Sequence, residues 1–238
     1  IKWCVQKDSA MEQGEIAIGL DIGTTKIVTI VGRKNEFDKI EILGFGKAKS
    51  LGVQRGVVSN ITQTIDSIKH AIADAEADSG ATIDNCVVGI AGQHIRSLQH
   101  SDYILRENAQ EVITQADVDL LVQNVHKLVM LPGEEIIHVL PQEFKIDGEP
   151  NISEPIGMLG RRLEANLHIV VGQKAAIGNI FSCVKNSNLE VSGITLEPLA
   201  SAEAVLSDEE REAGVCLVDI GGGTTDLAIF KDGIIRHT

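Results

Sequence analysis

A short motif of aspartate, glycine and threonine occurs twice in this chain, each time between two apolar segments predicted to be strands. The first copy spans residues 19–26 and the second spans residues 218–226. Glycines let the backbone approach phosphate oxygens and present N–H groups to them, and threonine hydroxyls add further donors. A single copy would be better explained as a tight hairpin. Two copies predict two related half-domains that grip a nucleoside triphosphate from both sides.

The residue types in the two loops predict a role for each position. The predicted phosphate contacts are Gly23, Thr24, Thr25 and Lys26 in the first loop and Gly221, Gly222, Gly223, Thr224 and Thr225 in the second. Asp21 and Asp219 end apolar strands, where a carboxylate can hold a hydrated Mg²⁺ that neutralises phosphates. A solvated lysine at a strand start explains Lys26 equally well. Asp226 can instead stabilise the second turn by accepting backbone hydrogen bonds.

Glu197 is the third part of the predicted site. It lies between the two loops in sequence, where a predicted strand ends and a helix begins. A carboxylate there can orient a water molecule or contact the shell of a Mg²⁺ ion, which makes Glu197 the candidate catalytic residue. A favourable acidic charge at a helix N-terminus, worth ~0.3–1 kcal/mol, explains the position equally well.

Composition narrows the classes of function. The 238 residues suffice for one large or two small domains, and the net charge of −13 argues against non-specific binding to nucleic acid or to an anionic membrane surface. No apolar run reaches the length of a membrane span and no secretory signal is recognisable, which predicts a reducing, cytoplasmic compartment. The cysteines show no Cys-x-x-Cys pairing, so zinc is not predicted. Cys86 and Cys216 lie in apolar, strand-like runs and are predicted to be buried thiols.

Hydrophobic periodicity predicts an α/β chain. Strands at 15–20, 26–33 and 39–47, joined by short turns, predict an antiparallel start. A helix is predicted from the cap at Asn60 to a stop at Gly80. The same pattern of strand, helix and strand returns at 166–171, 173–186 and 190–195, followed by a helix from Pro198.

Residues 86–165, between these two regions, show a different pattern of predicted elements, which indicates a small inserted α+β subdomain. A capping box of Thr114 and Asp117 begins a helix, extended segments follow at 136–140 and 142–146, and residues 147–162 are rich in turns. The predicted parts are a leader or added segment (1–13), a discontinuous first domain (14–85 and 166–207), the insertion (86–165) and the start of a second domain (208–238). The scattered His94, His126, His138 and His168 are interpreted as surface or hydrogen-bonded polar groups.

Two phosphate loops that bracket a strand–Glu-Pro–helix connector resemble the actin, sugar-kinase and heat-shock chaperone ATPase superfamily. Within it, the chain is similar to the FtsA family of bacterial cell-division proteins over about residues 14–238. The segments that carry this resemblance are 55–58, 92–95, 139–144, 146–147, 197–202, 208–215, 218–226 and 236–238. The loops indicate only the superfamily, whereas Pro141-Gln142-Glu143 inside the insertion indicates FtsA.

The resemblance implies an actin-like, ribonuclease H-like α/β fold in which 14–85 and 166–207 form subdomain 1A, 86–165 form subdomain 1C, and 208–238 begin subdomain 2A of an incomplete second domain. It implies binding of ATP and Mg²⁺, slow ATPase activity at most, and ATP-dependent self-assembly into filaments with a contribution from 1C. It further implies that the protein tethers filaments of the tubulin-like protein FtsZ to the inner face of the cytoplasmic membrane at the division site. Recruitment of later division proteins is expected through 1C.

The chain departs from the family pattern by stopping just after the second phosphate hairpin. The adenine-binding segment, the usual FtsZ site and the C-terminal amphipathic membrane helix would all lie beyond that point. A fragment with poor ATP affinity of its own is therefore expected, and its exposed strand edges invite association.

Three alternative functions differ in the sequence features that they require. A sugar or acetate kinase needs an acid/base pair and an acceptor pocket, for which the sequence shows no marker outside the loops. A chaperone-type ATPase needs a different insertion. An actin-like scaffold of another system, such as the pilus-assembly protein PilM, is the strongest rival because it carries a 1C-type insertion and differs mainly in its partner.

Overall fold

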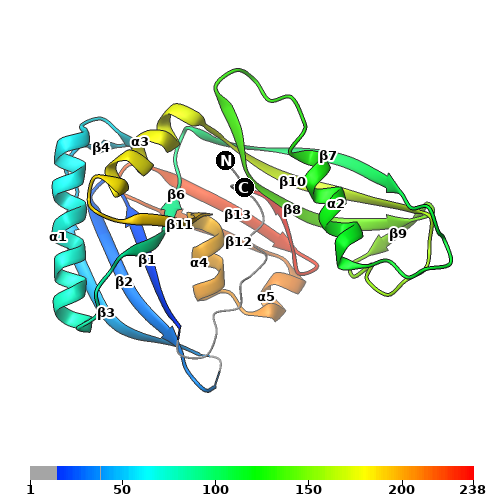
Figure 1. The fold of residues 1–238 in the computed structure, drawn as a ribbon, viewed down its shortest axis with the longest axis horizontal. Coiled ribbons are helices and arrows are strands. Elements are labelled where there is room, and N and C mark those ends of the chain that lie inside the picture. The colour runs from blue at the N-terminus through cyan, green and yellow to red at the C-terminus, as the bar shows by residue number, and fades with distance from the viewer. Residues whose placement is uncertain (1–14, 38) are drawn as a thin grey trace. The chain divides into compact units, whose positions relative to one another are not determined.

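The computed structural model describes residues 15–37 and 39–238, and it divides the chain into two compact units (Figure 1). Unit 1 contains the described residues up to Ile95, together with Gln173–Leu206 and Leu217–Ala228. Unit 2 contains Arg96–Gly172, Ser207–Cys216 and Ile229–Thr238. The leader predicted for residues 1–13 lies outside the described residues.

Unit 1 is built on a five-stranded sheet with the order β11-β6-β1-β2-β3. Its strands are β1 (Ile16–Ile22), β2 (Lys26–Lys34), β3 (Ile40–Lys49), β6 (Asn85–Ile90) and β11 (Glu190–Leu196). The pairs β1–β2 and β2–β3 are antiparallel, which confirms the antiparallel start predicted from the short turns. A short hairpin of β4 (Val53–Gln54) and β5 (Val57–Val58) follows β3.

The other three strands of this sheet run parallel and end at one edge. Asp21 of β1 pairs with Gly89 of β6, and Gly89 in turn pairs with Thr195 of β11. The carboxyl ends of β1, β6 and β11 therefore deliver the residues that follow them to the same place. In open α/β sheets, ligands bind outside the carboxyl ends of the strands.

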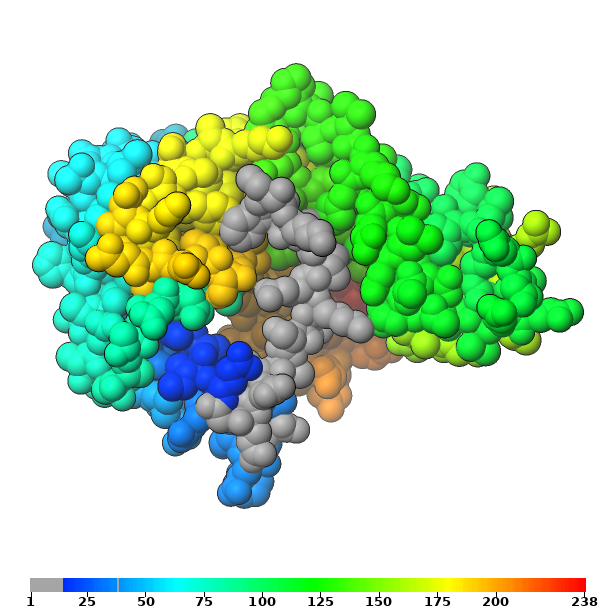
Figure 2. Space-filling view, viewed as in Figure 1, coloured from blue at the N-terminus to red at the C-terminus, as the bar shows by residue number. Residues whose placement is uncertain are grey.

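Helix α1 (Ile61–Ser79) begins and ends where the sequence predicts. The Asn60 side chain accepts a hydrogen bond from the N–H of Gln63, and Gly80 closes the helix in the left-handed conformation with its N–H donating to the carbonyl of Glu76. α3 (Lys174–Lys185) lies beside α1, as the yellow and cyan surfaces of Figure 2 show. The third helix of this unit is α4 (Glu197–Val205).

Two glycines of β3 set how closely α1 approaches the sheet. A Cβ on Gly44 would lie 2.5 Å from the Cβ of Ser79, and one on Gly46 would overlap the backbone carbonyl of Ala71. Only hydrogen at these two positions leaves room for the helix backbone. The contact between α1 and β3 therefore depends on glycine at both.

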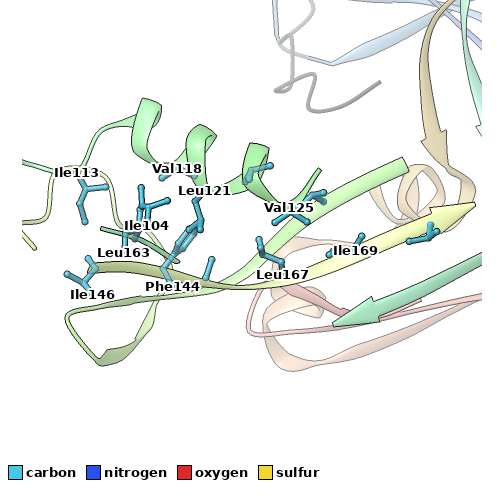
Figure 3. Packing of buried hydrophobic residues seen from close by; sticks show 14 residues of the cluster. Ile104, Ile113, Val118, Leu121, Val125, Phe144, Ile146, Leu163, Leu167 and Ile169 are labelled. Carbon is cyan, nitrogen blue, oxygen red and sulfur yellow. The ribbon is translucent and has the colours of Figure 1, made fainter. Parts of the chain in front are cut away.

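Unit 2 contains a four-stranded sheet with the order β7-β10-β8-β9, covered by α2. The elements are β7 (Ile95–Leu105), α2 (Gln115–Val125), β8 (Glu134–Ile146), β9 (Glu149–Ile152) and β10 (Arg162–Gln173). The predicted capping box of Thr114 and Asp117 is present. Val118, Leu121 and Val125 point from α2 onto the sheet, where they pack with Phe144 and Leu167 (Figure 3).

The extended segments predicted at 136–140 and 142–146 are both strand, but the break between them at Pro141 is absent, because β8 is continuous from Glu134 to Ile146. The neighbouring β9 pairs with β8 only between Phe144 and Ile146. Pro141 thus lies outside the stretch that pairs with β9, and a missing N–H there costs that ladder nothing. β7 and β9 were not predicted as strands.

A third sheet has the order β12-β13-β14. Its strands are β12 (Val215–Ile220), β13 (Thr225–Lys231) and β14 (Ile234–His237), and α5 (Asp208–Ala213) precedes it. The predicted burial of Cys216 is wrong, whereas Cys86 is buried as predicted. Accessibility alternates along β12, and Cys216 shares the exposed set with Val218 and Ile220.

Side chains of unit 2 form hydrogen bonds with residues 236–238, both with backbone carbonyl groups and with the side chain of Thr238. Ser97 Oγ donates to the carbonyl of Thr238 at 2.8 Å, and Gln99 Nε2 donates to that of Arg236 at 3.2 Å. Gln99 also contacts Nδ1 of His168 at 3.1 Å, while Nε2 of His168 lies 2.9 Å from Oγ1 of Thr238. The interpretation of His168 as a hydrogen-bonded polar group is confirmed.

None of the helices in the described part of the chain combines the length and the hydropathy that a transmembrane span requires.

Replacing Gly46 with alanine is expected to destabilise the protein by about 1–3 kcal/mol, because the added methyl group overlaps the backbone of α1. Gly19→Ala is the matched control in the same sheet, since a Cβ there meets no atom of the described residues within 4 Å. Urea unfolding followed by circular dichroism measures both. Equal midpoints for the two variants would contradict the packing argument.

The stability of unit 2 is expected to fall as the pH drops from about 6.5 to about 4. Burial, and then the nearby His237, lower the pKa of His168 from 6.5 to about 4. In that window the unfolded chain binds a proton that the folded chain does not, so acid favours unfolding. The difference in unfolding free energy between the wild type and His168→Gln isolates this residue, and a difference that does not change with pH would refute the assignment.

Candidate functional site

The two predicted phosphate loops contact each other within unit 1. The first is the turn of residues 23–25 between β1 and β2, and the second is the turn of residues 221–224 between β12 and β13. A Cβ on Gly223 would lie 2.7 Å from Oγ1 of Thr24, and one on Gly222 would overlap the side chain of Thr25. The glycines of the second loop thus leave the space in which the threonines of the first loop lie.

Each loop is also tightly closed by its own backbone. The N–H of Gly221 donates to the carbonyl of Thr224 at 2.9 Å. In the first loop a Cβ on Gly23 would lie 3.0 Å from the carbonyl of Lys26. Thr224 therefore contributes its carbonyl to the second turn, and Thr225 is the exposed first residue of β13.

Carboxyl groups from four elements, β1, α4, β12 and β13, converge beside these loops. Burial, followed by the charges of Asp21, Asp226 and Asp219, raises the pKa of Glu197 from 4.5 to about 8. Glu197 is the first residue of α4, and Gly89 of β6 makes room for it, because a Cβ on Gly89 would lie 3.2 Å from Cγ of Glu197. At neutral pH the carboxyl group of Glu197 is thus mainly protonated. It then lacks the negative charge that would interact favourably with the N-terminus of α4, which was the alternative explanation of this residue.

Asp21 near the end of β1 interacts electrostatically with Asp219 near the end of β12. Burial and the charge of Asp219 raise the pKa of Asp21, against the lowering effect of Lys26. Oδ2 of Asp219 accepts a hydrogen bond from Oγ of Ser201 at 3.0 Å. Ser201 was not predicted as part of the site. Its spacing of four residues from Glu197 puts both on one face of α4 and was the available signal.

The residues present fit a Mg²⁺–nucleotide complex by their chemistry. Backbone N–H groups of the glycines and threonine hydroxyls are donors for phosphate oxygens, and clustered carboxylates attract a divalent cation. Among the described residues, no group of three or more His, Cys, Asp or Glu side chains could hold a metal ion by itself.

The sequence interpretation of His94 as a surface or hydrogen-bonded polar group is wrong. The side chain is buried, and neither ring nitrogen has a hydrogen-bond partner in the described part of the chain. Burial lowers the pKa of His94, and the charge of Asp226 acts in the opposite direction. His94 is therefore close enough to Asp226, at the end of the second loop, to feel its carboxylate.

The sheet of unit 1 and its paired loops define an actin-like ATPase fold. A solved structure of the PilM–PilN type IV pilus biogenesis complex matches 92% of this chain and 59% of its own, with a TM-score of 0.66 and 12% sequence identity. At that identity the match shows the fold alone. The prediction of an actin-like α/β fold is confirmed.

Sequence relatives identify the family within this class. The cell division protein FtsA of Pseudomonas aeruginosa is 43% identical over 231 residues, which are 97% of this chain and 55% of that protein. The FtsA protein of Neisseria meningitidis is 40% identical over 229 residues, 96% of this chain and 55% of that protein. The family model of the SHS2 domain inserted in FtsA matches residues 92–171. The chain belongs to the FtsA family of bacterial cell-division proteins, and it spans about half the length of these relatives.

Glu197→Gln is expected to remove a pH dependence of stability. A carboxyl group with a pKa of about 8 in the folded state and 4.5 when unfolded stabilises the fold at low pH, and this contribution is lost as the pH rises from about 4.5 to about 8. The wild type should therefore lose up to about 1 kcal/mol per pH unit relative to the variant in this window. Urea unfolding in chelator at several pH values measures the difference, and parallel curves would contradict the predicted pKa.

Proposed function

We propose that this chain provides the phosphate-binding half of an ATP-dependent, actin-like scaffold protein of bacterial cell division. The observation that carries the proposal is the direct fit of Thr24 and Thr25 against Gly222 and Gly223. Two loops rich in backbone and hydroxyl donors face each other there, beside partly buried carboxylates. This arrangement suits a bound polyphosphate better than a purely structural hairpin, which has no need of three successive glycines.

Asp21 and Asp219 would hold the magnesium ion, whose charge neutralises the phosphates. The same charge would stabilise the ionised form of Asp21, whose pKa is raised in this structure. Ser201 fixes the orientation of Asp219 through the hydrogen bond from its hydroxyl. Cation and nucleotide are thus proposed to bind together, because phosphate alone would face repulsion from the carboxylates.

ATP binding would act on the conformation of the protein. Side chains of the first loop fill the space beside the glycines of the second, so phosphates can enter between them only if the loops separate. We propose that ATP and Mg²⁺ then bridge the loops and select the filament-forming conformation. Turnover is proposed to be slow at most, with Glu197 orienting the water molecule.

The remaining roles follow from the family. We propose that the whole protein tethers FtsZ filaments to the inner face of the cytoplasmic membrane at the division site, assembles with itself through 1C, and recruits later division proteins. The FtsZ site and the membrane helix are expected beyond the half that is matched here, whereas 1C is proposed to lie within it. All of these roles are therefore proposed for the full-length protein.

Thr24→Val is expected to lower the affinity of the full-length protein for Mg²⁺–ATP by about tenfold or more, since a hydrogen bond to a charged group is lost. Thr29→Val is the matched control in β2, because its buried hydroxyl has no hydrogen-bond partner among the described residues. Titration with a fluorescent ATP analogue measures affinity, and sedimentation with liposomes and FtsZ measures tethering. Wild-type protein that binds no nucleotide would overturn the proposal.

A further inference from the structure

His94 lies just beyond the end of β6, at the edge of the sheet where the proposed nucleotide site lies. β6 ends at Ile90, which pairs with Leu196 at the end of β11. One strand further along, Asp21 of β1 pairs with Gly89. His94 follows Ile90 by four residues, so it leaves the sheet at the same carboxyl edge as Asp21 and Glu197, where ligands of such sheets bind.

The backbone around His94 is held rigidly. Gly92 adopts φ +119°, and the N–H of Ile95 donates to its carbonyl at 3.0 Å. The carbonyl of His94 accepts a hydrogen bond from the N–H of Gln173 at 3.1 Å. A Cβ on Gly92 would lie only 2.9 Å from the carbonyl of Arg55. This tight turn preorganises the position of the imidazole ring.

The ring itself is in an unusual state for a buried polar group. His94 is 4% exposed, yet neither Nδ1 nor Nε2 has a hydrogen-bond partner among the described residues. Buried polar atoms nearly always have a partner, so an exception calls for an explanation such as a ligand. His168, which is buried to a similar degree, uses both ring nitrogens.

We propose that His94 is a nucleotide-binding residue, whose ring N–H donates a hydrogen bond to a phosphate oxygen of the ATP held between the two loops. The inference rests on the proposed function and adds a contact outside both loops. A phosphate oxygen is favoured over a metal ion as the partner, because Mg²⁺ prefers oxygen ligands. An ionised carboxylate offers no donor to a phosphate, whereas the neutral imidazole ring offers an N–H.

The test compares His94→Leu with His94→Asn and His94→Gln in the full-length protein, by titrating each with Mg²⁺–ATP and Mg²⁺–ADP. The leucine variant should bind ATP about tenfold or more weakly. Its thermal stability without nucleotide should be equal to or above that of the wild type, because two unpaired buried nitrogens are removed. At least one amide variant, which retains an N–H donor near Nδ1 or Nε2, should restore affinity to within about threefold.

The outcomes separate the two proposals. A loss confined to ATP assigns the contact to the terminal phosphate, and an equal loss for ADP assigns it to the inner phosphates; both support the role of His94. Unchanged affinity in the leucine variant means that the ring holds only water or Asp226, and overturns it. If the leucine variant does not fold, weak ATP binding by both folded amide variants overturns it as well. A wild type without nucleotide affinity refutes instead the proposed function on which the inference rests.

Discussion

The parallel run of β1, β6 and β11 is the constraint on which the rest of the site depends. Because these strands share one direction and one register, Asp21, Gly89 and Thr195 lie at the same level, and whatever follows them leaves the sheet at one edge. Glu197 is two residues beyond Thr195 and is brought against Gly89 by this register. A slip of one residue in either pairing would turn the side chains to the opposite face and dismantle the cluster.

The cluster of carboxylates works against folded stability. Glu197 is partly buried close to three aspartates, and its pKa of about 8 shows that its ionised form is disfavoured there. His94 adds two buried nitrogens without partners in the described residues. Proteins tolerate such local losses of stability chiefly at functional sites, where a bound ligand provides the missing hydrogen bond or the opposite charge. Both departures occur at the carboxyl edge of one sheet, which supports a common ligand as their cause.

Features that depend on a few neighbouring residues could be predicted from the sequence. The caps of α1 at Asn60 and Gly80 and the capping box at Thr114 are local hydrogen bonds, and the structure contains them. The antiparallel start of the sheet follows from short turns. The continuous path of β8 through Pro141 was not predictable in this way, because it depends on how far the neighbouring strand β9 extends.

The site was predictable to the same limit. Residue type and spacing in the repeated motif are sufficient to predict Asp21, Asp219 and the loop glycines as candidate site residues. The role of Ser201 depends on where α4 places it relative to Asp219. The unpaired state of the His94 ring depends on the absence of a hydrogen-bond partner among the described residues around it. Neither property is encoded near the residue in sequence. Histidine on an unremarkable segment is more often satisfied, as His168 is, and only the three-dimensional contacts distinguish the two.

The repeat does not make the site symmetric. Both copies share Asp-Ile-Gly and a pair of threonines, but the second has two additional glycines, Gly222 and Gly223, before its threonines. Those two glycines are the residues against which Thr25 and Thr24 of the first copy lie. The first loop therefore presents hydroxyl groups where the second presents bare backbone, so a phosphate chain between them would meet different donors on its two sides. Divergence between the copies, rather than their likeness, is what allows the two loops to fit together.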